Sequence, residues 1–446
     1  MSPPPLSRRD RLLRNTLQRF LNVQAQEVRA SFWALSYLFA FLCSSFMIRP
    51  MRDEMGIAGG VENLQWLFSG TFLAMLAAVP LFGWVSSRFP RRRFLPYLYT
   101  FFIVKLLVFF VLFQSDITHA WVARAFFIWV SIFNLFVVSV FWSFMADLFN
   151  NEQAKRLFGF IAAGGTVGAL VGPVLTTALA IPLGPTNLLL LSACFLLWAV
   201  VCVNRLVGCR TMRADPGAVD AAAPADVEQP MGGSVFAGVQ LVARSPYLLG
   251  ICALMLLFTT LATFLYFQQA QIIRDHFADP AARTAVFAAM DLAVNTLTIV
   301  IQVFVTGRLV KRLGLAATLC LIPLLLAAGF ALLGFAPVLA VLVLVQVVRR
   351  AGNYAIMRPA REMLYVVLGR EEKYKAKNFI DTVVYRGGDA VSAWVYAGLR
   401  ALGFSLAGIA WLAVPLAALW AWLAYTLGKR QTRIAASAEA VKTAMK

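Results

Sequence analysis

Apolar runs long enough to cross a bilayer follow one another along almost the whole chain, with only short segments between them. A spanning helix needs about 20 mainly apolar residues. Twelve such runs can be delimited, six on either side of a central polar segment, which predicts an all-α membrane protein of twelve transmembrane helices in two pseudo-symmetric six-helix bundles. The predicted spans are 31–50, 64–86, 94–113, 121–147, 156–181, 186–204, 247–272, 284–307, 315–334, 337–366, 377–400 and 404–427.

The composition supports the bilayer as the solvent of this chain. Hydrophobic residues make up 61% of it and charged residues only 14%, whereas soluble domains are nearer one half and one quarter. The net charge of +19 resembles that of a nucleic-acid-binding protein, but the charges are distributed differently. If both termini are cytosolic, most Lys and Arg lie on cytosolic segments and only Arg274, Arg283 and Arg400 lie opposite. This is the positive-inside pattern, and it predicts a multi-pass protein of the cell inner membrane without a nucleic-acid partner.

Several chemistries are not suggested. The six cysteines have no close pairs, and His119 and His276 are far apart, so neither a disulfide framework nor a zinc site is indicated. The chain has no Gly-rich phosphate loop, so nucleotide hydrolysis is not indicated either. We therefore expect no cofactor, no metal and no enzymatic activity. The predicted partners are the lipid bilayer and a small-molecule solute, with the protein as a monomer.

The chain also indicates a duplication. The ends of the second and eighth spans (Gly83 to Arg88, Gly307 to Arg312) recur at an offset of about half the chain length. So do Gly164-Gly165 with Gly387-Gly388 and Arg52-Asp53 with Arg274-Asp275. Parallel repeats of this kind are one known transporter plan. The predicted organisation is an amphipathic cytosolic segment on the membrane surface, a six-helix bundle, a cytosolic linker, a second six-helix bundle and a basic cytosolic tail, at 1–30, 31–208, 209–245, 246–428 and 429–446.

The basic loop G-W-V-S-S-R-F-P-R-R-R, which starts at Gly83, resembles the signature loop of the major facilitator superfamily. It departs from the family pattern at Ser87, where the family usually has Asp, whereas the copy G-R-L-V-K-R-L-G from Gly307 fits better. The resemblance implies a twelve-helix carrier fold in which these loops latch the cytosolic side. The implied cytosolic gate residues are Gly83, Arg88, Gly307 and Arg312. The alternative is plain positive-inside anchoring.

Ionisable residues within the predicted spans are candidate functional groups, because a charge in the bilayer is costly unless it is paired or hydrated. Lys105 and Arg386 lie ~17 Å and ~14 Å into their spans at 1.5 Å per residue. Arg349 and Arg350 lie midway along the tenth span. Arg exceeds the nearby carboxylates there, and its planar fork suits carboxylate or phosphate, so we predict an anionic substrate. The predicted substrate-binding residues are Arg386, Arg349, Arg350, Arg52, Arg49, Asn134, Asn353 and Tyr354.

A second set is predicted to act in coupling or gating, namely Asp291, Asp381, Asp389, Lys105 and Asp147. Asp389 lies three residues after Arg386, so the two can form a salt bridge on one helical face. Other interpretations stay open at the span ends, where Asp147 suits an interfacial position. The stretch from Arg49 to Glu54 is equally consistent with capping of the first helix at the outer interface.

Three tracts resemble the nucleotide translocase family, the ADP/ATP exchangers of plastids and intracellular bacteria, which share the facilitator fold. The first is R-E-M-L-Y-V-V-L-G-R-E-E-K-Y-K-A-K-N-F-I-D-T-V-V-Y-R-G-G-D at 361–389. The second is F-W-S-F-M-A-D-L-F-N-N-E-Q-A-K-R-L-F-G at 141–159, and the third is Arg52-Asp53. In the first tract the residues that fit are Arg361, Glu362, Met363, Tyr365, Lys375, Lys377, Asp381, Arg386 and Gly387.

The sequence departs from that family at charged positions. Asp389 stands where the family has Lys, and Arg52 where it has Lys. The family's Glu in the fourth span has no counterpart, and Asn134 is the main polar group there. The resemblance implies an alternating-access carrier, with substrate bound between the halves, for a phosphorylated or carboxylated metabolite or a nucleotide, by exchange or proton symport. The alternatives are a proton-coupled exporter or flippase for a neutral, cationic or amphipathic solute, and a receptor or assembly factor that transports nothing.

Overall fold

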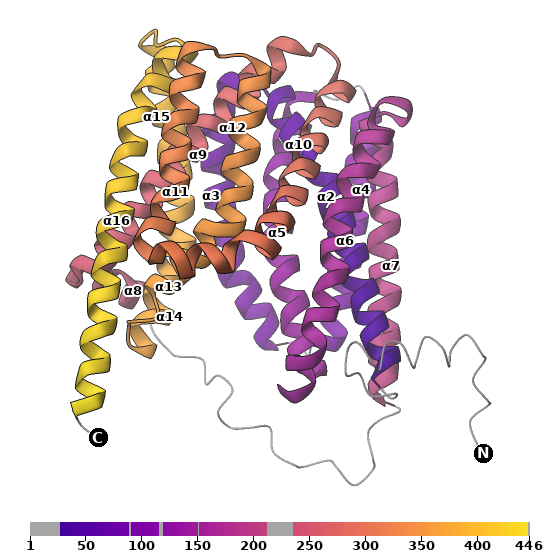
Figure 1. Cartoon of the computed structure of the whole chain (residues 1–446). Helices are drawn as coiled ribbons and strands as arrows, with labels where there is room; N and C mark the ends of the chain where they lie inside the picture. The colour runs from indigo at the N-terminus through magenta and orange to yellow at the C-terminus, as the bar shows by residue number, and fades with distance from the viewer. Residues whose placement is uncertain (1–26, 89–90, 116–118, 150, 212–234, 445–446) are drawn as a thin grey trace. The chain divides into compact units, whose positions relative to one another are not determined.

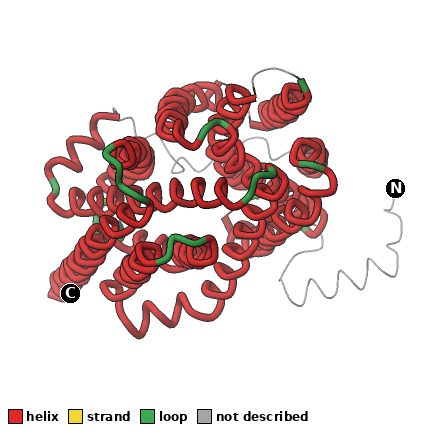
Figure 2. The backbone as a smooth tube through the Cα atoms, turned by 90° about the horizontal axis from the view of Figure 1, so that it is seen from above, coloured by secondary structure: helices red, strands yellow, loops and turns green. Residues whose placement is uncertain are grey.

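The computed structural model describes residues 27–88, 91–115, 119–149, 151–211 and 235–444. Almost all of these residues are helical, and short loops join the helices (Figures 1 and 2). The helices before the central segment are α2 (Val28–Ala58), η1 (Val61–Asn63), α3 (Leu64–Arg88), α4 (Arg91–Gln114), α5 (His119–Leu148), α6 (Asn151–Leu183) and α7 (Pro185–Thr211). Those after it are α8 (Val235–Arg244), α9 (Pro246–His276), α10 (Pro280–Ile301), η2 (Gln302–Thr306), α11 (Gly307–Phe335), α12 (Leu339–Gly352), η3 (Asn353–Met357), α13 (Arg358–Leu364), α14 (Arg370–Phe379), η4 (Ile380–Val384), α15 (Tyr385–Ala401) and α16 (Leu406–Ala444).

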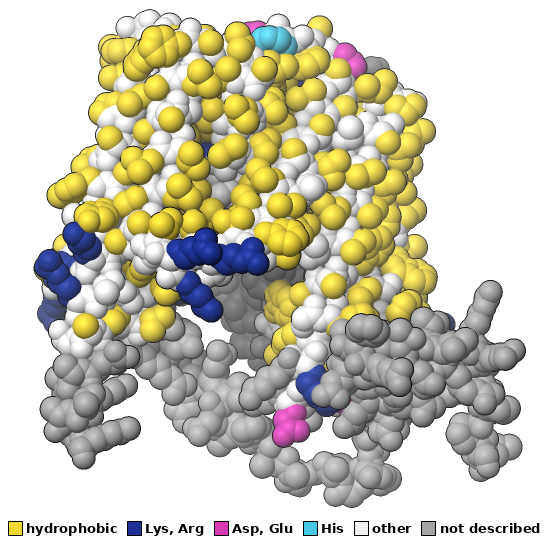
Figure 3. Space-filling model, in the orientation of Figure 1, with side chains coloured by type: hydrophobic (Ala, Val, Ile, Leu, Met, Phe, Trp, Pro, Cys, Tyr) yellow, Lys and Arg dark blue, Asp and Glu magenta, His cyan; other side chains and the backbone are white. Residues whose placement is uncertain are grey.

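Nine helical stretches of the described chain are long and apolar enough to cross a membrane. One of them runs over 56 residues, Pro280–Phe335, and includes both α10 and α11. Leu, Val, Phe and Trp side chains cover much of the outer surface (Figure 3), as expected where lipid replaces water. The helical membrane fold predicted from the hydropathy pattern is therefore confirmed at this level.

Two predicted segments lie mostly outside the described residues, namely the amphipathic N-terminal segment at 1–30 and the linker at 209–245. The described part of the linker includes the helix α8. The stretch from residue 429, predicted as a basic cytosolic tail, is helical in its described part. It continues α16 without a break to Ala444, because the stretch from Lys429 onward contains good helix formers and neither Gly nor Pro.

The chain divides into two compact units that do not follow the two halves of the sequence. Of the described residues, unit 1 contains those within 27–55, 77–211 and 280–289, and unit 2 contains those within 56–76, 235–279 and 290–444. The start of α3 therefore belongs to unit 2, and the start of α10 belongs to unit 1.

In unit 1, glycines set the packing of α6 against α2. Gly164, Gly168 and Gly172 recur every four residues, so they share one face of α6. A Cβ on Gly168 would lie 2.4 Å from the carbonyl oxygen of Phe39. The absence of a side chain therefore lets the two backbones approach closely, as small residues do between membrane helices. The core of this unit also contains many buried aromatic side chains, including Phe41, Phe126 and Phe133, among aliphatic ones.

Replacing Gly168 with Ala should destabilise the protein by about 1–3 kcal/mol, because the added methyl group overlaps backbone atoms that cannot move aside. Gly159→Ala is the matched control on the same helix, since nothing lies within 4 Å of its Cβ position. That variant should be neutral or up to about 1 kcal/mol more stable, through helix propensity. Thermal unfolding in detergent compares the two, and equal melting temperatures would contradict the close approach.

In unit 2, α11 packs along α16, and α9 packs against α15 and α16. The helices of this unit are interrupted by three π-helical segments, η2, η3 and η4. Short π segments displace side chains from the regular α-helical pattern and are frequent at functional sites. Here η3 begins three residues after Arg350, and η4 ends two residues before Arg386.

Candidate functional site

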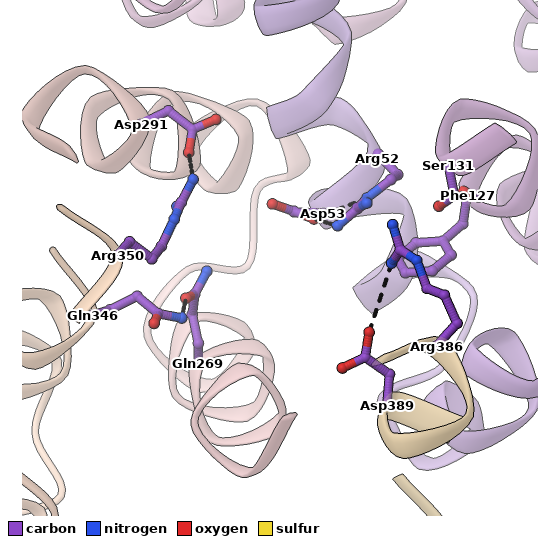
Figure 4. Close-up of polar contacts among 10 residues, drawn as sticks. All are labelled: Arg52, Asp53, Phe127, Ser131, Gln269, Asp291, Gln346, Arg350, Arg386 and Asp389. Carbon is purple, nitrogen blue, oxygen red and sulfur yellow. Dashed lines mark hydrogen bonds and ion pairs between the residues drawn. The ribbon is translucent and has the colours of Figure 1, made fainter. Parts of the chain in front are cut away.

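A buried ion pair lies between α10 and α12 in unit 2. Arg350 donates from Nη2 to Oδ1 of Asp291, and the two side chains point toward each other (Figure 4). Their side chains are 10% and 2% exposed, respectively. Burying either charge alone would be costly. The ion pair offsets that cost and therefore explains how both charged side chains can lie inside an apolar helix bundle.

Amide side chains extend this polar layer. Gln346 of α12 donates from Nε2 to Oε1 of Gln269 on α9, and both are buried (Figure 4). Arg349 donates from Nε to Oε1 of Gln346 over 2.9 Å. Arg349 and Arg350 are adjacent in sequence but have different partners, because successive side chains on an α-helix point about 100° apart. The partner of Arg349 is thus a neutral amide, whereas that of Arg350 is a carboxylate.

A second Arg–Asp pair lies on α15. Arg386 Nη1 is 3.6 Å from Asp389 Oδ2, one helical turn away (Figure 4). The guanidinium also lies 5.1 Å from the centre of the Tyr385 ring, a cation–π distance. Thr263 of α9 reaches Asp389 from its hydroxyl at 3.5 Å. At 36% exposed, the Arg386 side chain is the more accessible of the pair.

Glycines position α15 for these contacts. A Cβ on Gly388 would lie 2.5 Å from Thr259 Oγ1 of α9, so a larger residue would push the helices apart. A Cβ on the neighbouring Gly387 would lie 3.8 Å from Phe72 of α3, an ordinary van der Waals distance. The Arg-Gly-Gly-Asp sequence therefore combines charged side chains with a close helix contact.

The π segment η3 carries two of the predicted binding residues, Asn353 and Tyr354. Asn353 Oδ1 is buried and accepts no hydrogen bond from the described residues. Thr306 of η2 donates to the carbonyl oxygen of Ala355 at 2.8 Å, which joins two of the irregular segments. Such a carbonyl oxygen is available because a π turn breaks the regular hydrogen-bond ladder.

The predicted polar residues of unit 1 form separate contacts. Arg52 donates to Asp53 at 2.7 Å and lies 4.8 Å from the centre of the Phe127 ring (Figure 4). Ser45 donates to Asn134 Oδ1 at 2.6 Å, which connects α2 with α5. Arg49 lies 5.9 Å from the Phe46 ring.

The remaining predicted residues lie elsewhere. Lys105 is half-buried on α4, 5.6 Å from the Phe101 ring, on a face with exposed apolar residues. Asp381 is 3.8 Å from Arg361, and Asp147 is exposed near the end of α5. Of the proposed gate residues, Gly83 lies within α3 and Arg88 ends it, whereas Gly307 begins α11 and Arg312 is exposed on it.

Sequence reasoning did not predict several of the polar contacts. Glu54 of α2 is fully buried and lies 3.0 Å from Arg283 of α10, within unit 1. Glu62 of η1 lies 2.5 Å from Arg274 of α9, within unit 2. Both pairs join residues more than 200 positions apart, so no local spacing indicates them. Gln269 and Gln346 are uncharged, and a search for charges within spans passes over them.

Metal-binding clusters are not found in the described part of the chain, where no three His, Cys, Asp or Glu side chains gather. The site instead combines guanidinium groups, carboxylates, amides and aromatic rings on α9, α10, α12 and α15. These groups can bind and release a polar solute, and none forms a nucleophile–base pair of the kind that covalent catalysis needs.

The family profile of the Major Facilitator Superfamily matches residues 30–367, about three quarters of the chain. The chain belongs to the major facilitator superfamily. It is accordingly a multi-pass membrane transporter, as the resemblance of its signature loops implied, and not an enzyme.

Solved structures of transporters share this fold. The nucleoside transporter NupG has a TM-score of 0.62 at 12% identity and covers 91% of this chain and 98% of its own. A bacterial homologue of the iron transporter ferroportin, in an inward-facing state, gives 0.64 at 13% identity and covers 91% of this chain and 98% of its own. At these identities the likeness shows the fold alone.

Curated relatives include ADP,ATP carrier protein 1 of Chlamydia muridarum (strain MoPn / Nigg), which is 22% identical over 351 residues. The carrier of the same name from Chlamydia trachomatis serovar D (strain ATCC VR-885 / DSM 19411 / UW-3/Cx) is 23% identical over 355 residues. Each match covers 71% of this chain and 66% of the relative, just under two thirds of the relative's length. The resemblance to nucleotide translocases is therefore confirmed as a weak similarity.

Proposed function

We propose that the chain is a secondary active transporter for an anionic, phosphorylated or carboxylated metabolite, with nucleotides as the first class to test. It would work by alternating access, by exchange or proton symport, as a monomer in the cell inner membrane with both termini in the cytosol. The proposed twelve spans count α10 and α11 separately and add α5 and the η4–α15 helix to the stretches already recognised by length and hydropathy.

One observation carries the anionic substrate. The polar layer of unit 2 contains three guanidinium groups, on Arg349, Arg350 and Arg386, and the carboxylates beside them are Asp291 and Asp389. Arg350 and Arg386 each have one of these carboxylates, whereas the described hydrogen bond of Arg349 goes to the neutral Gln346. This layer therefore carries one more positive than negative charge within an apolar protein. A carboxylate or phosphate of the substrate would balance it.

The neighbouring residues suit accessory roles in that proposal. Gln269, Asn353 and Tyr354 offer hydrogen-bonding groups beside the guanidinium groups, and Asn353 Oδ1 accepts no bond from the described residues. In unit 1, Arg52 and Arg49 are the candidate anion contacts, with Asn134 as a polar neighbour. Asp291, Asp389 and Asp381 are the candidates for coupling protons, because each faces a guanidinium that its protonation would release.

A second candidate function is proton-coupled export or flipping of a cationic, neutral or amphipathic solute. The observation in its favour is that two of the three Arg residues already have carboxylate partners. Those pairs would then serve as switches, and the substrate would not need to carry negative charge.

Uptake by reconstituted vesicles distinguishes the two. Labelled ATP, ADP, a sugar phosphate and a dicarboxylate are presented in turn, each with and without the same unlabelled compound inside. Saturable uptake of one anion supports the first function, and stimulation by the internal compound identifies exchange. Proton release or uptake on addition of a lipophilic cation, with no anion transported, would favour the second.

A further inference from the structure

The beginning of α11 is set apart from the rest of the helix. The π segment η2 precedes it, and Gly314 follows it with φ +74° and ψ 173°, which is not a helical conformation. A left-handed φ of this kind is easily adopted only by glycine. The residues between these two breaks, Gly307 to Leu313, form a short helical segment that runs crosswise to α12 and α16 (Figure 1).

This segment carries three exposed basic side chains, on Arg308, Lys311 and Arg312. Leu309 and Val310 are half-buried, so the segment has a packed side and a charged side. The preceding turn exposes Val303 and Phe304, at 68% and 58%. Charged groups next to exposed apolar groups are typical of a helix that lies in the membrane interface.

The end of α16 carries a second basic group. Lys429, Arg430 and Arg433 are exposed, and they follow directly on the place where α16 contacts α11. There, a Cβ on Gly428 would lie 2.5 Å from the Cα of Ala316. Exposed aromatic side chains stand just before them, Trp422 and Tyr425, with Lys429 4.5 Å from the Tyr425 ring. Lys and Arg side chains gather below the hydrophobic surface at this level of the molecule (Figure 3).

No acidic residue accompanies these six cations in either stretch, 302–318 or 420–437. The positive-inside pattern explains why such residues gather on one side of the membrane. It does not explain why breaks in the helix place three of them together on one short crosswise segment. The charges lie next to the exposed Val303, Phe304 and Trp422, so one ligand that contacts both groups needs an anionic and an apolar part. A phospholipid supplies both a phosphate and acyl chains.

We propose that the α11–α16 basic surface, formed by Arg308, Lys311, Arg312, Lys429, Arg430 and Arg433, is a binding site for anionic phospholipid headgroups. The phosphate groups bind the guanidinium and ammonium groups, while the acyl chains lie along the apolar and aromatic side chains above them. The site is separate from the buried polar layer of α10, α12 and α15, so it does not depend on the identity of the transported solute.

The test measures binding of phosphatidylglycerol and phosphatidylcholine to the detergent-solubilised full chain by native mass spectrometry. One variant carries Arg308→Gln, Lys311→Gln and Arg312→Gln, and a second carries Lys429→Gln, Arg430→Gln and Arg433→Gln. The matched control removes three exposed Arg residues elsewhere, with Arg205→Gln, Arg244→Gln and Arg400→Gln. At about fivefold for each basic residue near anionic lipid, each surface variant should bind phosphatidylglycerol roughly 100-fold more weakly. The control and the binding of phosphatidylcholine should change little.

A charge-preserving variant, Lys311→Arg with Lys429→Arg, should keep the affinity and shows whether a loss reflects charge or misfolding. The charge-reversed variant Arg308→Glu, Lys311→Glu and Arg312→Glu should prefer a cationic lipid. The proposal is overturned if the surface variants bind phosphatidylglycerol like wild type, or if the control loses as much. It is also overturned if millimolar inorganic phosphate displaces the lipid, because the surface would then be a site for soluble phosphate.

Discussion

Arg349→Gln should lower the uptake of an anionic substrate at sub-saturating concentration by about 10- to 100-fold. Hydrogen bonds to charged groups contribute about 1.5–3 kcal/mol, and each 1.4 kcal/mol is a factor of ten in affinity. The described hydrogen-bond partner of Arg349 is the neutral Gln346, and Asp389 keeps its ion pair with Arg386, so removal of Arg349 breaks no direct ion pair. The loss should therefore appear in transport, with little change in stability.

Two further variants make this result specific. Arg349→Lys should recover part of the uptake, because an ammonium keeps the charge but not the planar fork that binds carboxylate or phosphate in two places. Arg358→Gln removes an exposed Arg in the same unit and should transport like wild type. Wild-type uptake by Arg349→Gln would exclude Arg349 from the substrate site and remove the main support for an anionic substrate.

The contrast between Arg349 and Arg350 shows how far the sequence predicts the site. Hydropathy and spacing place both guanidinium groups deep in one span, and the structure keeps them there. Their partners come from other helices, Asp291 lying 59 positions away and Gln269 lying 77 positions from Gln346. Spacing along one chain carries no information on which distant side chain a given helical face meets.

The same reasoning separates the predictable parts of the fold from the rest. Apolar length and charge placement depend on the membrane itself, so the helical spans follow from the sequence. The π segments and the break at Gly314 depend on how helices pack and turn, and Gly314 is only one of 29 glycines. The start of α3 belongs to unit 2 and the start of α10 to unit 1, and this assignment likewise depends on tertiary packing. It places Glu54 beside Arg283 and Glu62 beside Arg274, which no half-length repeat predicts.

Breaking the Asp291–Arg350 pair should have the largest effect on stability. We expect Asp291→Asn or Arg350→Met alone to cost about 3–5 kcal/mol, because each leaves an uncompensated charge in the protein interior. The double variant should be more stable than either single variant, since no charge remains. Chemical unfolding in detergent measures this double-mutant cycle, in which the coupling energy is the departure from additivity.

The Glu62–Arg274 pair is the matched control for this cycle. Its side chains are 69% and 33% exposed, so Glu62→Gln and Arg274→Met should show a coupling of at most about 1 kcal/mol. If the Asp291–Arg350 cycle gives a coupling as small as this, water must reach the buried pair and screen it. A large coupling would mean that the pair is dry, and a proton bound by Asp291 would then release Arg350 as an uncompensated buried charge. In that case the free-energy effect of protonating Asp291 would be large enough to favour a different helix arrangement. Proton coupling at this position requires such an effect.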